Sequence, residues 1–76
     1  MERIVEVGKT YKHFKGHIYK VICIAIDSED LSKKVIYQNI NDNKIWVRDY
    51  DMFNSLVDKE KYPDIKQEYR FEEIDE

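Results

Sequence analysis

Residues 11–21 read YKHFKGHIYKV, and this stretch decides the fold. It contains Gly16, one of only two glycines, with aromatic and apolar residues on both sides. Glycine takes a positive φ without steric penalty and therefore favours a tight turn. Aromatic and β-branched residues, in contrast, are enriched in strands. The stretch therefore predicts two strands folded over a turn at residues 15–17, with most of the apolar chain packed on them.

The second of these strands, residues 18–26, is the strongest strand signal in the chain. Its sequence, IYKVICIAI, is mostly apolar on both alternating faces and rich in β-branched residues. Two apolar faces are typical of a long, bent strand that contributes to both halves of a small barrel. A buried helix is the alternative, and the turn signals on both sides argue against it. One face is predicted to carry Ile18, Lys20, Ile22, Ile24 and Ile26.

The middle of the chain predicts a hairpin followed by a short helix. Residues 33–39 and 44–49 alternate on either side of Asn41-Asp42-Asn43, whose side chains favour a turn. In residues 50–57 the apolar side chains fall at i, i+1 and i+4, a spacing that fits one or two helical turns.

The last third of the chain predicts a loop and a closing strand. Residues 58–66 are charged and contain the single proline, Pro63, whereas residues 67–74 alternate again. Residues 1–76 are therefore predicted to form one domain, with a small, strongly bent antiparallel sheet of about five strands, an SH3-like barrel, and one short helix. The predicted core contains Phe14, Ile18, Val21, Ile22, Ile24, Val35, Val47, Met52, Phe53 and Phe71.

Several short motifs occur in an order that resembles a known family. They are Tyr11-Lys12-His13-Phe14-Lys15-Gly16-x-x-Tyr19-x-Val21, Ser28-Glu29, Val35-x-Tyr37, Trp46-Val47-Arg48, Met52-Phe53 and Arg70-Phe71. From about Gly8 to Phe71, the chain resembles the domain of unknown function 1653 family of bacterial proteins. The resemblance implies a small, mostly β domain with no biochemical function attached. The chain has Asp27 and Asp30 where the family tends to have His and Thr, and Asp49 where it tends to have Pro, so no histidine role is carried over to that loop.

Composition and charge limit the partners and the cellular compartment that we expect for this chain. The net charge is −3, with residues 1–20 net basic and the rest net acidic. This balance argues against tight, non-specific binding of nucleic acid, which needs many phosphate contacts, but leaves room for a small basic patch. Cys23 is the single cysteine, so no internal disulfide forms, and no apolar run reaches the roughly 18 residues of a membrane span. We expect a cytoplasmic protein that does not enter the membrane.

One group of residues is predicted to form a ligand-binding surface. Trp46 and Arg48 share a strand face, and an aromatic ring beside a guanidinium can stack a base and hold a carboxylate or phosphate. The alternative is that Trp46 belongs to the core and Arg48 pairs with one of the many acids. The predicted surface consists of Tyr11, His13, Tyr37, Trp46 and Arg48.

The chain offers little for catalysis, metal binding or cofactors. His13 and His17 flank a turn, but zinc needs three or four protein ligands and no further motif supplies them. Cys23 lies in the most apolar strand, where a thiol is inert. Ser28-Glu29 and the neighbouring acids match no calcium-loop spacing. We therefore expect no catalytic residue, no metal, no cofactor and no enzyme activity.

The expected function is that of a non-catalytic binding module whose ligand is a peptide, a nucleotide or a short single strand. This expectation combines the predicted surface with the common use of small barrels as binding modules, which is an analogy at the level of fold. The alternative is a protein-interaction domain that self-associates, as a weak homodimer, by pairing exposed strand edges.

Overall fold

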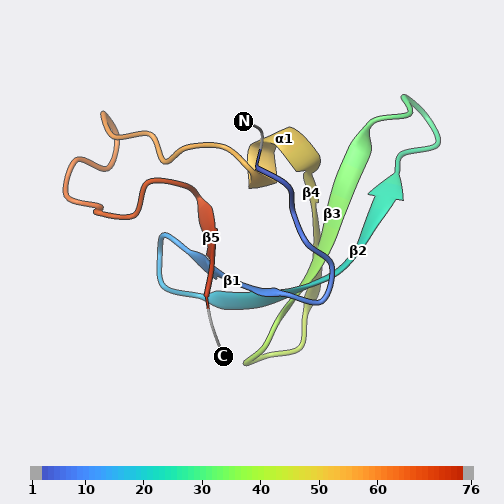
Figure 1. The fold of residues 1–76 in the computed structure, drawn as a ribbon, viewed down its shortest axis with the longest axis horizontal. Helices are drawn as coiled ribbons and strands as arrows, with labels where there is room; N and C mark the ends of the chain where they lie inside the picture. The colour runs from blue at the N-terminus through green and yellow to red at the C-terminus, as the bar shows by residue number, and fades with distance from the viewer. Residues whose placement is uncertain (1–2, 75–76) are drawn as a thin grey trace.

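The computed structural model describes residues 3–74, which form one five-stranded antiparallel sheet and a single turn of helix (Figure 1). The predicted strands are confirmed, and the strand order in the sheet is β4-β3-β2-β1-β5. All neighbouring strands in this order are antiparallel. Short turns join β1 to β2, β2 to β3 and β3 to β4, whereas β5 returns from the far end of the chain to pair with β1. The elements are β1 (Thr10–His13), β2 (Ile18–Ile26), β3 (Lys33–Asn39), β4 (Ile45–Asp49), α1 (Tyr50–Phe53) and β5 (Phe71–Glu73).

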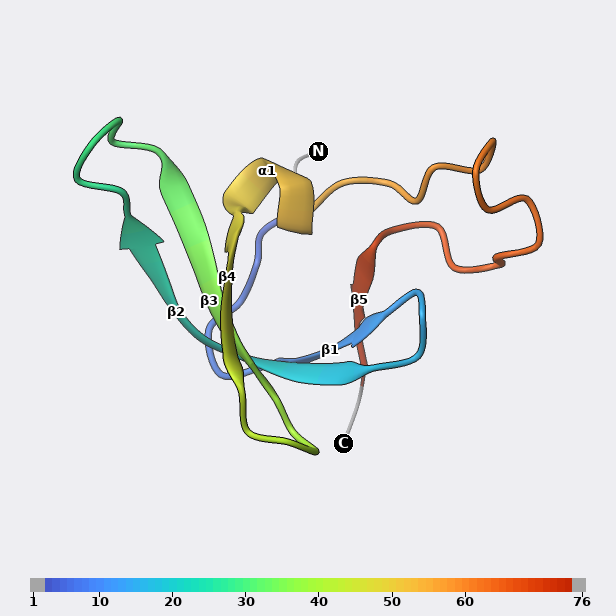
Figure 2. The same ribbon diagram turned by 180° about the vertical axis from the view of Figure 1, so that it is seen from behind.

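The long strand β2 carries the bend of the sheet. Its first part pairs with β1, while its pairing with β3 continues to its far end. In both ribbon views, β1 and the start of β2 run across the molecule, whereas β3 and β4 run at a steep angle to them (Figures 1 and 2). β4 and β5 lie at the two ends of the strand order and do not pair with each other, so the sheet is open. The predicted bend is confirmed, and closure into an SH3-like barrel is not.

A β-bulge at Ile22 explains why β2 is apolar on both faces. Val21 pairs with Tyr37 and Cys23 with Ile36, so Ile22 is an extra residue in the ladder. An extra residue shifts the alternation of side chains by one. Val21 therefore faces the core before the bulge and Ile24 packs against it afterwards. The prediction that Ile18, Lys20, Ile22, Ile24 and Ile26 share one face is wrong for this reason.

The core lies on the concave side of the sheet, around two stacked phenylalanines. The rings of Phe53 and Phe71 are 4.0 Å apart and nearly parallel at 7°. Val21 and Val35 are buried beside them, as predicted. Tyr11 and Tyr37 meet Phe53 edge-on at 5.4 and 5.3 Å.

Three predicted core residues are instead exposed. Ile22 lies in the bulge, and Met52 lies on the outer side of the one-turn helix. Val47 alternates with Trp46 and Arg48 on β4 and so faces away from the core. The helix is also shorter than the predicted 50–57, because Ser55 already leaves the helical path and its hydroxyl donates to the Met52 carbonyl at 2.6 Å.

The segment between α1 and β5 is a long loop whose base is tied together. Leu56 and Tyr69 form an isolated bridge, and the Arg70 amide donates to the Ser55 carbonyl at 2.9 Å. The predicted loop at 58–66 is confirmed, and the closing strand is shorter than predicted, spanning 71–73. Across residues 3–74, no helix has the length and apolar character that a membrane crossing requires.

Candidate binding groove

A groove of about 330 Å³ opens on the concave side of the sheet. The β1–β2 hairpin, β3, β4, β5 and the long loop before β5, all visible in Figure 2, contribute to it. We call it the aromatic groove. It is lined by His13, Phe14, Lys15, His17, Tyr19, Tyr37, Trp46, Arg48, Tyr62, Arg70 and Phe71.

The inner wall of the aromatic groove is a set of interlocked rings. Tyr19, Tyr37 and Phe71 meet pairwise edge-to-face, with centroids 5.0 Å (Tyr19–Tyr37), 5.8 Å (Tyr19–Phe71) and 5.4 Å (Tyr37–Phe71) apart. Aromatic pairs favour this geometry. Burial raises the pKa of the Tyr19 hydroxyl, so it stays protonated at neutral pH. Because Phe71 also stacks on Phe53, the wall is continuous with the core and is held rigidly.

Trp46 contributes an exposed indole ring to the lining of the groove. It lies on β4 directly opposite Tyr37 on β3, so the two share a face of the sheet. The side chain is 48% exposed, and the interpretation of Trp46 as a core residue is therefore wrong. An exposed tryptophan beside a tyrosine provides a surface on which a planar ring can stack.

Arg48 extends over the inner wall and has no acidic partner among residues 3–74. Its Nε donates to the Tyr37 hydroxyl at 3.2 Å, and its guanidinium carbon is 5.5 Å from the centre of the Phe71 ring. The ion pairs found within residues 3–74 join Lys34 to Asp27 and Asp49, and none involves Arg48. The alternative prediction, that Arg48 pairs with an acid, fails for the described part of the chain.

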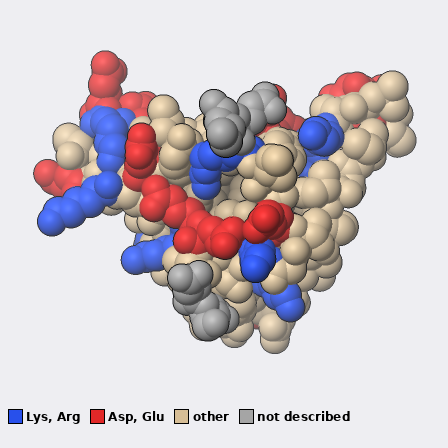
Figure 3. All heavy atoms as spheres, in the orientation of Figure 1, with Lys and Arg blue, Asp and Glu red and all other residues tan. Residues whose placement is uncertain are grey.

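The other charged groups of the aromatic groove are also basic. Lys15 and Arg70 line it, and no aspartate or glutamate of the described part of the chain does. The Arg70 Nε is buried and makes no hydrogen bond to any described residue. Acidic side chains gather elsewhere, in a band across the face of the molecule that carries β5 (Figure 3). The groove is thus a basic patch on a chain whose net charge is −3.

His13 is partly buried and lies among these positive charges, and both lower the pKa of its ring. Burial and the nearby charges of Arg48, Lys15, His17 and Arg70 lower its pKa from 6.5 to about 4. The Lys15 amide donates to its Nδ1 at 3.1 Å, so the neutral ring carries its proton on Nε2. At neutral pH His13 therefore presents an N–H donor.

Four of the five predicted surface residues meet in the groove, and Tyr11 does not. His13, Tyr37, Trp46 and Arg48 all line it. Tyr11 is only 3% exposed, and its hydroxyl accepts a hydrogen bond from the Glu6 amide at 2.9 Å. Burial raises the pKa of that hydroxyl. Tyr11 packs into the core beside Phe53, deeper along β1 than His13, and the structure therefore places it outside the predicted surface.

Sequence reasoning missed several groove residues. Tyr19 pairs with Tyr11 across β1 and β2, so strand pairing could have indicated it. Arg70 directly precedes the predicted core residue Phe71, and nothing in the sequence places it near Arg48, because like charges repel. Tyr62 comes from the long loop and contacts Phe14 at 5.0 Å, and no signal in the sequence foretells that contact.

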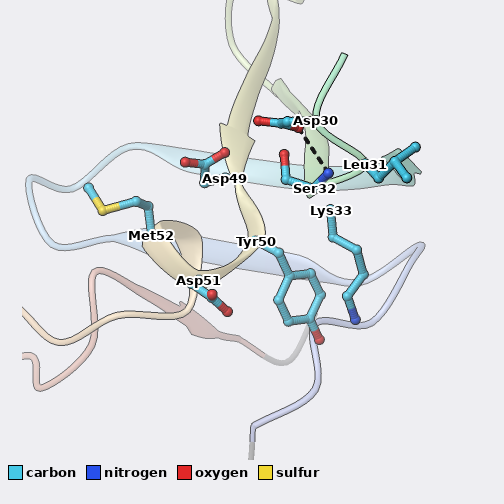
Figure 4. A pocket seen from close by; sticks show the side chains of 8 residues that line it. All are labelled: Asp30, Leu31, Ser32, Lys33, Asp49, Tyr50, Asp51 and Met52. Atoms are coloured by element: carbon cyan, nitrogen blue, oxygen red, sulfur yellow. Dashed lines mark hydrogen bonds between the residues drawn. The ribbon is translucent and has the colours of Figure 1, made fainter. Parts of the chain in front are cut away.

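A second hollow, of about 430 Å³, lies between the β2–β3 loop and the start of α1 (Figure 4). Its acids do not converge: Figure 4 shows Asp30, Asp49 and Asp51 pointing in different directions. Asp30 accepts the Ser32 amide at 2.9 Å, and Asp49 pairs with Lys34. The part of the chain that the structure describes contains no cluster of three or more metal-binding side chains. This hollow offers no ligand chemistry comparable to that of the aromatic groove.

Comparison with known proteins gives one match. Residues 9–73 match the model of the family described as "Protein of unknown function (DUF1653)". No curated protein matches, and no solved structure matches.

Proposed function

The chain thus belongs to the DUF1653 family, and from this premise we propose that it is a non-catalytic binding module whose aromatic groove takes a nucleotide or the end of a short single strand. In this arrangement the base stacks on Trp46, and the phosphate lies against the guanidinium groups of Arg48 and Arg70. The N–H of His13 provides a further donor for the phosphate or sugar.

The proposal rests on one observation above all: the groove combines an exposed indole with two arginines that have no acidic partner among the described residues. Arginine is the side chain best suited to bidentate contacts with phosphate. Stacking on an aromatic side chain contributes roughly 1–3 kcal/mol per base. Both contributions are available within one groove, on a chain that is otherwise acidic.

The size of the groove supports a small ligand. Ligand pockets span about 300–1,000 Å³, and a groove of about 330 Å³ lies at the lower end of that range. One nucleotide unit suits this volume better than a long polymer. A peptide with a free carboxylate shares the anionic chemistry, and the experiment below separates it from a nucleotide.

The lining of the groove supports binding without catalysis. Among the described residues that line it there is no serine, cysteine, aspartate or glutamate, so these residues supply no Ser–His, Cys–His or carboxylate pair. Cys23 is exposed on the outer face of the sheet, opposite Ile36. The Nδ1 of His13 is already occupied by the Lys15 amide, which leaves the neutral ring without a free base nitrogen.

A ligand panel tests the proposal through the fluorescence of Trp46, the single tryptophan. The panel contains adenosine monophosphate (AMP), adenosine, inorganic phosphate, a short oligothymidylate and a short acidic peptide, each titrated at low salt. We expect AMP and the oligonucleotide to quench Trp46, and adenosine to bind at least about tenfold more weakly because it lacks the charge-assisted contacts. Quenching by the peptide alone would replace the nucleotide with a carboxylate ligand. No response to any member would overturn the proposal.

A further inference from the structure

The edge strand β4 exposes a row of apolar side chains. Ile45 is 63% exposed, Trp46 48% and Val47 61%, and within residues 3–74 β4 has a hydrogen-bonded neighbour on one side only. Natural sheets usually protect an edge with charges, bulges or a very short strand. The pairing of β4 with β3 is regular over its whole length, and its first three residues carry no charge.

The opposite edge of the sheet is protected. β5 is only three residues long and contains Glu72 and Glu73. In addition, Arg3 reaches it from the N-terminal segment, and its Nη2 donates to the Phe71 carbonyl at 2.8 Å. An open end that could continue the sheet is therefore found at β4 and not at β5. Pairing of β4 with β5 of another copy would give an open filament, whereas pairing of β4 with β4 closes on itself.

The free hydrogen-bonding groups of β4 follow from its pairing with β3. The Asn39 amide donates to the Lys44 carbonyl at 3.0 Å, and the register continues through Tyr37 and Trp46. In an antiparallel ladder, alternate residues bond to the same neighbour. Trp46 and Arg48 therefore bond to β3, while the amides and carbonyls of Ile45, Val47 and Asp49 point outward.

We propose that β4 pairs antiparallel with β4 of a second copy of this chain, with the two-fold axis at Val47. In this register Val47 lies opposite Val47 of the partner subunit, and Ile45 lies opposite Asp49 of the partner subunit. The outward amides and carbonyls of all three residues are paired, giving about six hydrogen bonds. A shift of two residues in either direction loses part of this pairing.

The side chains are also complementary in this register. Trp46 lies opposite Arg48 of the partner subunit in a pair that is not hydrogen-bonded, where side chains approach most closely. The aliphatic stem of Arg48 can pack beside that indole, while its guanidinium stays over Tyr37 and Phe71 of its own chain. Asp49 keeps its own partner, because Lys34 of the same chain already holds it. The two sheets become one continuous sheet, and the aromatic grooves of the two copies meet across the axis.

The dimer does not depend on a groove ligand, so it can be tested in the free protein. A contact along one short strand falls below about 1,200 Å², the size class of weak and transient complexes. The mass is therefore measured by sedimentation over about 10 μM to 1 mM, the range in which such a contact associates. We expect the average mass to rise toward twice that of the monomer.

Val47→Lys supplies the decisive variant, because the two-fold axis places one lysine against another. Its matched control is Ile26→Lys on β2, since Ile26 is 58% exposed and lies away from the β4 edge. We expect Val47→Lys to stay monomeric throughout and Ile26→Lys to dimerise as the parent does. A parent that stays monomeric, or a dimer that survives Val47→Lys, overturns the proposal.

If Val47→Lys fails to fold, a disulfide crosslink between the two copies tests the proposed register of β4 against β4. In a Cys23→Ser background, Val47→Cys places the two new thiols opposite each other at the axis, with Cα atoms about 5.5 Å apart, which a disulfide spans. Ile26→Cys in the same background is the control. Under mild oxidation we expect covalent dimer from Val47→Cys several-fold faster than from Ile26→Cys, and equal rates contradict the register.

Discussion

The Nε of Arg48 donates a hydrogen bond of 3.2 Å to the hydroxyl of Tyr37, on the neighbouring strand β3. Tyr37 is itself buried against Phe53, so it anchors the arginine to the core. The two terminal nitrogens of Arg48 make no hydrogen bond to any described residue and remain available for an anion. An arginine held at one end and free at the other is preorganised for binding, since less rotamer entropy is lost when the ligand arrives.

Replacing Arg48 with glutamine removes the positive charge of the guanidinium from the groove. Arg48→Gln should weaken the binding of AMP by about tenfold or more, because a hydrogen bond to a charged group contributes roughly 1.5–3 kcal/mol. For an oligonucleotide, the dependence of log K on log salt should become shallower by about one unit. The measurement is a titration of Trp46 fluorescence at several salt concentrations.

Lys44→Gln is the matched control for Arg48→Gln. Lys44 lies in the exposed turn between β3 and β4, outside the groove lining. Its replacement by glutamine removes one positive charge, as Arg48→Gln does. It should leave AMP affinity nearly unchanged. If both variants lose affinity equally, binding reflects overall charge and the groove is not the site.

His13 should titrate far below an ordinary histidine. Its pKa is about 4, because burial and the positive charges of Arg48, Lys15, His17 and Arg70 disfavour the protonated ring. An NMR titration of the ring signals checks this directly. A bound phosphate should raise the His13 pKa, because a negative charge nearby favours the imidazolium.

The lowered pKa of His13 makes the free energy of unfolding depend on pH. The unfolded chain protonates His13 near pH 6.5, whereas the folded chain does so only near pH 4. Protons therefore bind preferentially to the unfolded state in this window, and the free energy of unfolding should fall as the pH drops from 6.5 to about 4. His13→Asn, which can still accept the Lys15 amide, should show a shallower fall in urea denaturation. An equally steep fall would mean that other groups cause it.

Phe53 contributes much of the packing that stabilises the core. It is 1% exposed and contacts Tyr11, Tyr37 and Phe71. Phe53→Ala should cost about 3–5 kcal/mol, enough to leave little folded protein in a domain this small. Met52→Ala, one residue earlier and 45% exposed, is the control and should cost less than about 1 kcal/mol. Similar thermal melts for the two variants would refute this description of the core.

Tyr11→Phe separates the structural role of Tyr11 from the predicted binding surface. The change leaves the Glu6 amide without its acceptor at 2.9 Å, so stability should fall by about 0.5–1.5 kcal/mol. AMP affinity should stay the same, because Tyr11 does not line the groove. A selective loss of binding in a variant of normal stability would return Tyr11 to the site.

The strand pattern of this chain was predictable because alternation and turn chemistry are local. Gly16, with φ +101°, and Asn43, with φ 63°, lie in the turns that the sequence indicates. The bulge at Ile22 was not predictable, because a run that is apolar on both faces gives no signal of where the alternation shifts. Val47 is exposed because it alternates with Trp46 and Arg48 and so lies on the face of β4 away from the core, and its own β-branched side chain does not reveal which face of the sheet is covered.

The candidate site was predictable where it depends on a single strand. Trp46 and Arg48 are two residues apart on β4, so they share a face whatever the rest of the fold does. Tyr11 and His13 also share a face of β1, yet only one reaches the groove, because the depth along a bent sheet depends on packing against Phe53. The contact of Phe14 with Tyr62 depends on the path of a long loop, which neither periodicity nor propensity specifies.

The most direct test of the account is an amide and side-chain NMR titration of the isotope-labelled protein with AMP. We predict saturable shifts at the indole of Trp46, the guanidinium of Arg48 and the ring of His13, with little change around Asp30 and Asp51 in the second hollow. Shifts centred on that second hollow, or none at millimolar AMP and low salt, would contradict the claim that the aromatic groove binds a nucleotide.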